Sequence, residues 1–96
     1  MKRDEVLARV RLHRDQLIQL GVKSLDLFGS VARDEARSDS DVDFLVEFEK
    51  SGGLFQLLRV KHYLEDLLEC PVDLGTRQAL KEHLREPVLQ DAIHVF

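Results

Sequence analysis

The sequence is poor in cysteine and has no long apolar run. Its 96 residues include a single cysteine, Cys70, so no disulfide can form within the chain. No apolar stretch approaches the roughly 20 residues that span a bilayer. The residues after Met1 are interrupted by charge and do not resemble a signal peptide. These absences exclude a disulfide-stapled fold, indicate no membrane contact and predict a cytoplasmic protein.

An excess of basic charge is also absent. Lysine and arginine number 14 against 18 acidic residues, and the net charge is −4. A field of that sign repels a phosphate backbone, so direct nucleic-acid binding is not expected. The four histidines are scattered without the spacing of metal ligands and are expected mostly at the surface: His13, His62, His83 and His94.

The spacing of apolar residues predicts alternating helices and strands. Helical periodicity covers residues 4–20 and 54–69, with a short helix over 30–36 and a last helix after Thr76 that Pro87 ends. Alternation predicts strands over 23–28, 41–48 and 72–74. This order indicates an α/β fold, a small mixed sheet of about three strands with helices packed against it, as one domain over residues 1–96.

Two apolar segments are given a packing role. The leucine stripe that runs from Leu54 to Leu68 is predicted to form core on its helix. The closing segment 88–96 is apolar enough to pack on the body of the protein or on a partner. Tyr63 and Cys70 are likewise interpreted as packing residues rather than as an acceptor of a transferred group or a catalytic thiol.

Three aspartates carry the strongest chemical pattern. Asp41 and Asp43 are two residues apart on a predicted strand, so their side chains emerge on the same face. Carboxylates in this arrangement suit Mg²⁺, which prefers oxygen ligands. Asp73, on the third predicted strand, is the candidate that would complete a site for two metal ions. The plain alternatives are a solvated strand end for Asp41 and Asp43 and a half-exposed strand position for Asp73.

A phosphate-binding turn is predicted where the first strand ends. Gly29 allows close approach of the backbone, and Ser30 adds a hydroxyl donor beside the free amides of a helix start. Arg33, one turn later, is placed to reach a phosphate oxygen. A turn glycine, a helix N-cap and a surface ion pair are the corresponding alternatives without a ligand.

These residues resemble a known family. The segments LFGSVAR (27–33) and SDVDFLV (40–46) resemble the signature of the DNA polymerase β-like nucleotidyltransferase superfamily: Gly-Ser, ten residues, then Asp-x-Asp. The short chain is similar to the minimal nucleotidyltransferases, MNT, the antitoxin partners of HEPN-domain toxins. Asp73 stands where that family carries its third acidic strand.

The resemblance implies a fold, an activity and a partner. It implies the minimal nucleotidyltransferase fold, with Asp41, Asp43 and Asp73 holding two Mg²⁺ ions and Asp73 helping to deprotonate the acceptor. It implies that ATP is the substrate and that AMP passes to a tyrosine of a cognate HEPN ribonuclease toxin, which is thereby neutralised. Asp34 departs from the family pattern, where glycine is expected; if the position needs a positive φ, aspartate tolerates it at some cost.

Two other functions stay open at this stage. The chain could be a non-catalytic antitoxin that occludes its partner through the last helix and the tail from Ile93 to Phe96. It could also transfer a nucleotide to a small hydroxylated molecule, although 96 residues show no added substrate-binding domain. Self-association and a hetero-oligomer with the toxin are both compatible with the sequence.

Overall fold

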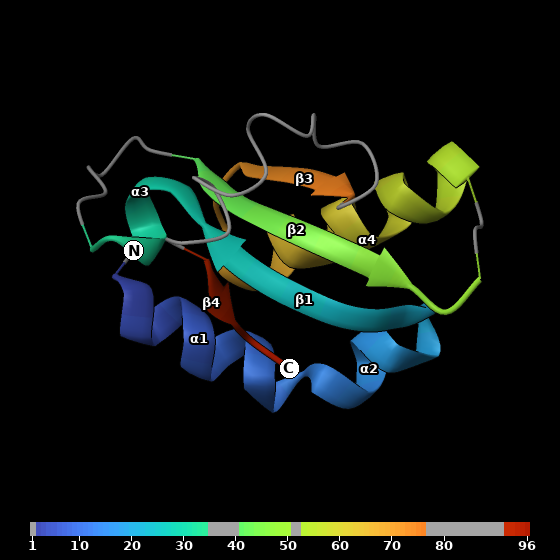
Figure 1. Ribbon diagram of the computed structural model, residues 1–96, viewed down its shortest axis with the longest axis horizontal. Helices are drawn as coiled ribbons and strands as arrows, with labels where there is room; N and C mark the ends of the chain where they lie inside the picture. Colours follow the sequence, from blue (N-terminus) through green and yellow to red (C-terminus); the bar gives the residue numbers. More distant parts are fainter. Residues whose placement is uncertain (1, 35–40, 51–52, 77–91) are drawn as a thin grey trace.

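A four-stranded sheet forms the centre of the computed structural model, which describes residues 2–34, 41–50, 53–76 and 92–96. Its strands are β1 (Val22–Phe28), β2 (Val42–Phe48), β3 (Val72–Thr76) and β4 (Ile93–His94), in the spatial order β3-β2-β1-β4 (Figure 1). Strand β1 is antiparallel to β2 and β4, whereas β2 and β3 are parallel. The predicted mixed sheet is confirmed, with β4 as one strand more than expected.

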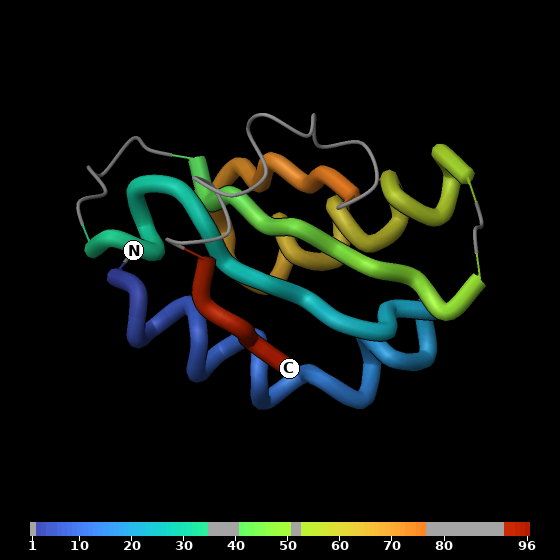
Figure 2. The backbone as a smooth tube through the Cα atoms, viewed as in Figure 1, coloured from blue at the N-terminus to red at the C-terminus, as the bar shows by residue number. Residues whose placement is uncertain are grey.

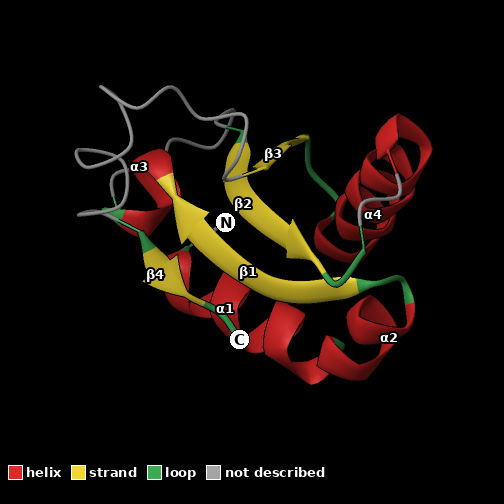
Figure 3. Cartoon of the chain, turned by 45° about the vertical axis from the view of Figure 1, so that its right-hand side comes forward, coloured by secondary structure: helices red, strands yellow, loops and turns green. Residues whose placement is uncertain are grey.

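Three helices cover one face of this sheet. They are α1 (Arg3–Leu12), α2 (Arg14–Gln19) and α4 (Gly53–Leu68), while the short α3 (Gly29–Ala32) follows β1 directly. Figure 3 shows α1, α2 and α4 on the same side of the strands. The other side of the sheet carries none of these three helices, and alternation along the strands puts Asp26, Asp43 and Asp73 on that side.

The core lies between the sheet and the three helices. Alternation along the strands directs Leu25 and Leu27 of β1, and Phe44 and Val46 of β2, toward the helices, where all four are fully buried. The helices contribute buried side chains to the same core: Val6, Val10, Leu17, Val60, Leu64 and Leu68. Burial of the apolar face is therefore what decides which way each strand faces.

The predicted first helix is interrupted. His13 leaves the helical conformation, with φ −106° and ψ 21°, and its N–H bonds to the carbonyl of Val10 at 3.0 Å, three residues back. The break separates α1 from α2. It leaves Leu12 80% exposed, while Leu17 on α2 reaches the core. A single continuous helix was wrong here because the chain bends to follow the sheet.

The leucine stripe of α4 was only partly a core stripe. Leu64 and Leu68 are buried, but Leu54 is 66% exposed and Leu58 is 37% exposed. The buried face includes Val60, which the leucine pattern had not singled out. The exposed leucines lie in the first turns of α4, which extend past the end of β3 (Figure 2).

The end of the chain packs on the body, as one of the two sequence alternatives had it. Val95 is buried, and the Arg11 side chain donates from Nε to the carbonyl of Val95 (2.9 Å) and from Nη2 to that of His94 (3.1 Å). The C-terminal trace lies beside α1 in Figure 2.

The predicted helix after Thr76, with its leucines and Pro87, and the loop 37–40 lie outside the described residues. No helix within the described ranges is long and apolar enough to cross a membrane.

The residue that follows α4 provides a test of the backbone. Glu69 has a φ of 56°, a left-handed conformation that glycine adopts without cost and other residues adopt at roughly 1 kcal/mol. We expect Glu69→Gly to raise the free energy of unfolding by about 0.5–1 kcal/mol in urea denaturation. Glu69→Ala, which keeps a Cβ, is the matched control; an equal gain in both variants would show that charge rather than backbone conformation is responsible.

Candidate active site

Strand direction brings the predicted site residues to one edge of the sheet. Because β1 is antiparallel to β2 and β3 is parallel to β2, the end of β1 meets the beginnings of β2 and β3. Phe28, Asp43 and Asp73 occupy one row across the three strands, since Phe28 pairs with Asp43 and Asp43 pairs with Asp73. Gly29 and Ser30 follow at the same edge, where α3 starts.

The carboxylates of this edge influence one another. Burial raises the pKa of Asp43 above its ordinary value of 3.8, and the negative charges of Asp73 and then of Asp41 raise that pKa further. The Arg33 guanidinium acts in the opposite direction and lowers the pKa of Asp43. Asp43 is half-buried, whereas Asp41 and Asp73 are exposed. The half-buried acid therefore stands between two exposed acids and close to one cation.

The three acids do not form a closed cage. Within the described part of the chain, no group of three His, Cys, Asp or Glu side chains is arranged closely enough to hold a metal ion. Repulsion between like charges opposes a closer approach of carboxylates. Asp43 and Asp73 share a register position, and Asp41 precedes β2 by one residue. The backbone therefore brings the three acids to the beginnings of β2 and β3 without closing them around one point.

Gly29 is held against Asp43. Its φ is 76°, and a Cβ built on Gly29 would overlap the Asp43 carboxylate. Both the backbone conformation and the space therefore require glycine at this position. Ser30 is half-buried in the first turn of α3, and Arg33 caps the end of that helix on the surface. The predicted turn thus lies directly against one of the predicted acids, Asp43.

Asp34 has the left-handed backbone conformation that the family resemblance had suggested as a possibility for this position. Its φ is 58°, so a position where the family pattern expects glycine does require the left-handed region here. Aspartate is one of the residues that tolerate this region, at a cost of about 1–2 kcal/mol relative to the usual conformation. The residue after Arg33 is therefore held in the left-handed region without being glycine.

One pair on this face was missed by sequence reasoning. Asp26 of β1 is 2% exposed, and its Oδ1 lies 2.9 Å from Nδ1 of His94 on β4. Alternation puts Asp26 on the face of Asp43, because Asp26 pairs with Leu45, two residues after Asp43. The alternation of Leu25 and Leu27 could have predicted that Asp26 lies on the opposite face of β1. Its partner could not be predicted, because His94 lies 68 residues away in the chain.

Two side chains that had been set aside as packing residues do pack. Tyr63 and Cys70 are partly buried against the hydrophobic core. Burial raises the pKa of the Cys70 thiol, which disfavours the thiolate that a nucleophile would need. Among the other histidines in the described ranges, His62 is exposed and His13 is half-exposed. His83 lies outside those ranges.

Comparison with known proteins decides the family. Residues 10–95 match the family model of the nucleotidyltransferase domain. The chain is 37% identical over 93 residues to protein adenylyltransferase MntA of Thermococcus cleftensis, an alignment that covers 96% of this chain and 94% of the relative. It is also 39% identical over 80 residues to a Methanocaldococcus jannaschii protein assigned as a protein adenylyltransferase, covering 83% of this chain and 86% of that one.

The chain belongs to the nucleotidyltransferase domain family. Solved structures agree in fold. One assigned to the minimal nucleotidyltransferases matches with a TM-score of 0.84 and 41% identity, covering 97% of this chain and 95% of the other. The MNT antitoxin solved with the tri-AMPylated HEPN toxin of Shewanella oneidensis matches with a TM-score of 0.61 at 19% identity, over 88% of this chain and 70% of the other. The minimal nucleotidyltransferase fold and the enzyme class are therefore those that the sequence resemblance implied.

The contact between Gly29 and Asp43 gives a direct test of this candidate site. Gly29→Ala should lower the free energy of unfolding by about 1–2 kcal/mol, because alanine strains the positive φ, and should weaken Mn²⁺ binding by displacing Asp43. Urea denaturation and titration with Mn²⁺ measure the two effects. Gly75→Ala is the control: its Cβ would lie 3.9 Å from Leu45 Cδ2, an ordinary contact. Equal losses in both variants would contradict a special role for Gly29.

Asp43 makes stability depend on pH in a defined direction. A raised pKa means that the folded chain holds a proton which the unfolded chain has lost, so stability falls as pH rises from 3.8 through the pKa of folded Asp43. With a chelator present, Asp43→Asn should therefore melt at a higher temperature than wild type at pH 7–8. That difference should shrink as the pH falls toward 3.8. Thermal melts across this range check it, and a variant less stable than wild type at pH 8 would refute it.

Proposed function

We propose that this chain transfers AMP from ATP to a hydroxyl group of a protein, with Asp41, Asp43 and Asp73 as its catalytic acids. The observation that carries the proposal is the row across the sheet edge, where Asp43 and Asp73 pair in register and Gly29 abuts Asp43. The names of the relatives, protein adenylyltransferases at 37–39% identity, support ATP and a protein acceptor.

The acids suit a divalent cation. All three offer carboxylate oxygens, the ligands of hard cations. The pKa of Asp43 is raised by burial and then by the negative charges of Asp73 and Asp41. A cation relieves such repulsion. Asp41, Asp43 and Asp73 would hold two Mg²⁺ ions, which when bound activate the attacking oxygen and stabilise the leaving pyrophosphate.

The remaining residues have roles that follow from their places. Gly29 lets the backbone approach the triphosphate, and the amides and the hydroxyl at Ser30 donate to its oxygens. Arg33, close enough to act on the charge of Asp43, adds a cation beside the phosphates. Asp73 is exposed on the edge strand of the described sheet, which supports access by the acceptor, and in this proposal it takes the proton of the acceptor hydroxyl.

The acceptor that we propose is a tyrosine of a cognate HEPN-domain toxin. The support is the MNT antitoxin of Shewanella oneidensis, solved with a tri-AMPylated HEPN toxin, whose fold this chain shares. In this proposal the modification neutralises a ribonuclease in the cytoplasm. A second candidate is neutralisation by binding alone, which is favoured by the exposed apolar side chains at the start of α4, where Phe55 is 81% and Leu54 66% exposed.

Transfer can be tested with ATP labelled at either phosphate. With a candidate toxin and Mg²⁺, label should reach the toxin from the α-position and not from the γ-position, at a tyrosine that mass spectrometry identifies. The Asp43→Asn variant should transfer AMP more than about 100-fold more slowly than wild type. Removing an outer partner of a metal ligand costs about 10–100-fold, and Asp43 is itself a proposed ligand, so its loss should exceed that range. Transfer of AMP by Asp43→Asn at the wild-type rate would contradict the catalytic proposal. Silencing of the toxin without label would establish the binding alternative.

A further inference from the structure

Strand β3 is the most weakly held of the strands that bear the acids. It lies at the edge of the described sheet and pairs with β2 alone, in a parallel ladder that is slightly less stable per residue than an antiparallel one. Asp73 is its second residue. Asp73 pairs in register with Asp43, so two acidic side chains of like charge lie side by side across this ladder. The end of β3 that carries the acid is therefore the end where charge opposes pairing.

The apolar side chains of β3 provide one restraint. Val72 and Leu74 are 3% and 8% exposed and face the helices. They anchor the strand to the core, but apolar packing has no direction and does not by itself hold the first residue of β3 in register. A directed interaction at that residue would do so.

Val72 makes such an interaction with α4. The N–H of Val42 on β2 bonds to the carbonyl of Pro71 at 3.0 Å. Because backbone groups alternate in direction along a strand, the N–H of Val72 points away from β2, toward the free edge. There it donates to Oε2 of Glu65 at 3.1 Å. An edge amide that would otherwise be open is thus bound by a helix carboxylate.

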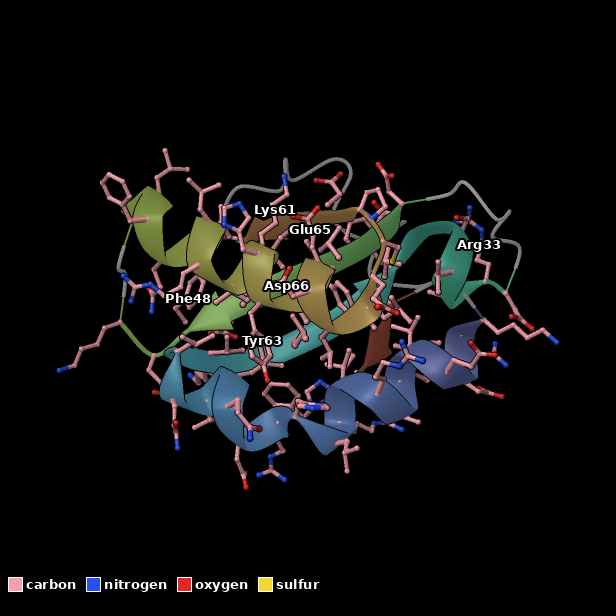
Figure 4. The ribbon with its side chains drawn as sticks, turned by 180° about the vertical axis from the view of Figure 1, so that it is seen from behind. Arg33, Phe48, Lys61, Tyr63, Glu65 and Asp66 are labelled. Atoms are coloured by element: carbon pink, nitrogen blue, oxygen red, sulfur yellow. The ribbon has the colours of Figure 1, made fainter. Side chains whose placement is uncertain are left out.

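The neighbourhood of Glu65 offers its own comparison. Glu65 is half-buried, while Asp66, the next residue, is exposed. Figure 4 shows both on α4, with Glu65 nearer to β3. The two carboxylates carry the same charge on the same turn, and only that of Glu65 bonds to Val72 among the hydrogen bonds of the described residues. A role of charge can therefore be separated from a role of hydrogen bonding.

We propose that Glu65 is a positioning residue of the nucleotidyltransferase site: by binding the N–H of Val72 it holds the start of β3, and so places Asp73 beside Asp43 for a divalent cation. The inference rests on the proposed function for the identity of the acids, but it concerns metal binding before any transfer. Glu65 touches neither substrate nor cation in this account. Glu65 acts on the site indirectly, because it binds Val72 and Asp73 is the next residue of β3.

The experiment measures Mn²⁺ binding to the full chain by paramagnetic resonance, without nucleotide or acceptor. Glu65→Ala should raise the Mn²⁺ dissociation constant by about tenfold, the low end of what outer partners of metal ligands contribute. Glu65→Gln keeps an acceptor oxygen at the same reach and should restore binding to within about twofold of wild type. Asp66→Ala removes the same charge from the neighbouring position and should leave the dissociation constant unchanged.

A second variant covers the case in which Glu65→Ala does not fold. Glu65→Asp keeps the charge but withdraws the carboxylate by one methylene, so it should bind Mn²⁺ as weakly as the alanine variant is expected to. Hydrogen exchange at the Val72 amide should be faster in Glu65→Asp and unchanged in Glu65→Gln. Wild-type Mn²⁺ affinity in folded Glu65→Asp or Glu65→Ala overturns the proposal. If Glu65→Ala and Glu65→Asp bind Mn²⁺ about tenfold more weakly than wild type while Glu65→Gln binds normally, yet no AMP is transferred, the positioning role stands and the adenylyl transfer fails.

Discussion

Two carboxylates on neighbouring parallel strands are the constraint around which this small protein is organised. Asp43 and Asp73 pair in register, and burial, followed by the negative charge of Asp73, raises the pKa of Asp43. Such an arrangement costs stability and persists only because the surrounding structure holds it. The buried faces of β2 and β3 pack on α4, and the ladder between these strands sets the register. The site is therefore sustained from the opposite face of the sheet.

Backbone conformation contributes the second constraint. Gly29 abuts the carboxylate of Asp43 with a positive φ, and Asp34 closes the turn after α3 in the same left-handed region. A side chain at position 29 would occupy the space of the acid, so close approach of backbone and carboxylate needs glycine. The turn at the end of β1 and the start of β2 are thus fitted to each other.

Local patterns foretold most of the strands and the chemistry. Alternation in β2 separated Phe44 and Val46 from Asp43, and those residues do lie on opposite faces. The same reasoning failed where tertiary packing overrides periodicity. The first helix breaks at His13, and Leu54 and Leu58 stay exposed because α4 is longer than the strand beneath it. Helical spacing records which residues share a side, but not whether anything lies opposite them.

By itself the sequence determined the strand phases, the spacing of Gly29, Asp41 and Asp43, and with them the family, because these follow from neighbours along the chain. The tertiary structure decided what depends on contacts between distant residues. It pairs Asp73 with Asp43 across two strands and joins Asp26 to His94 by a hydrogen bond. It also brings the Glu65 carboxylate to the N–H of Val72 at the edge of β3 in the described sheet. The partner of a strand or of a buried acid is chosen by the packed fold, since no local period encodes it.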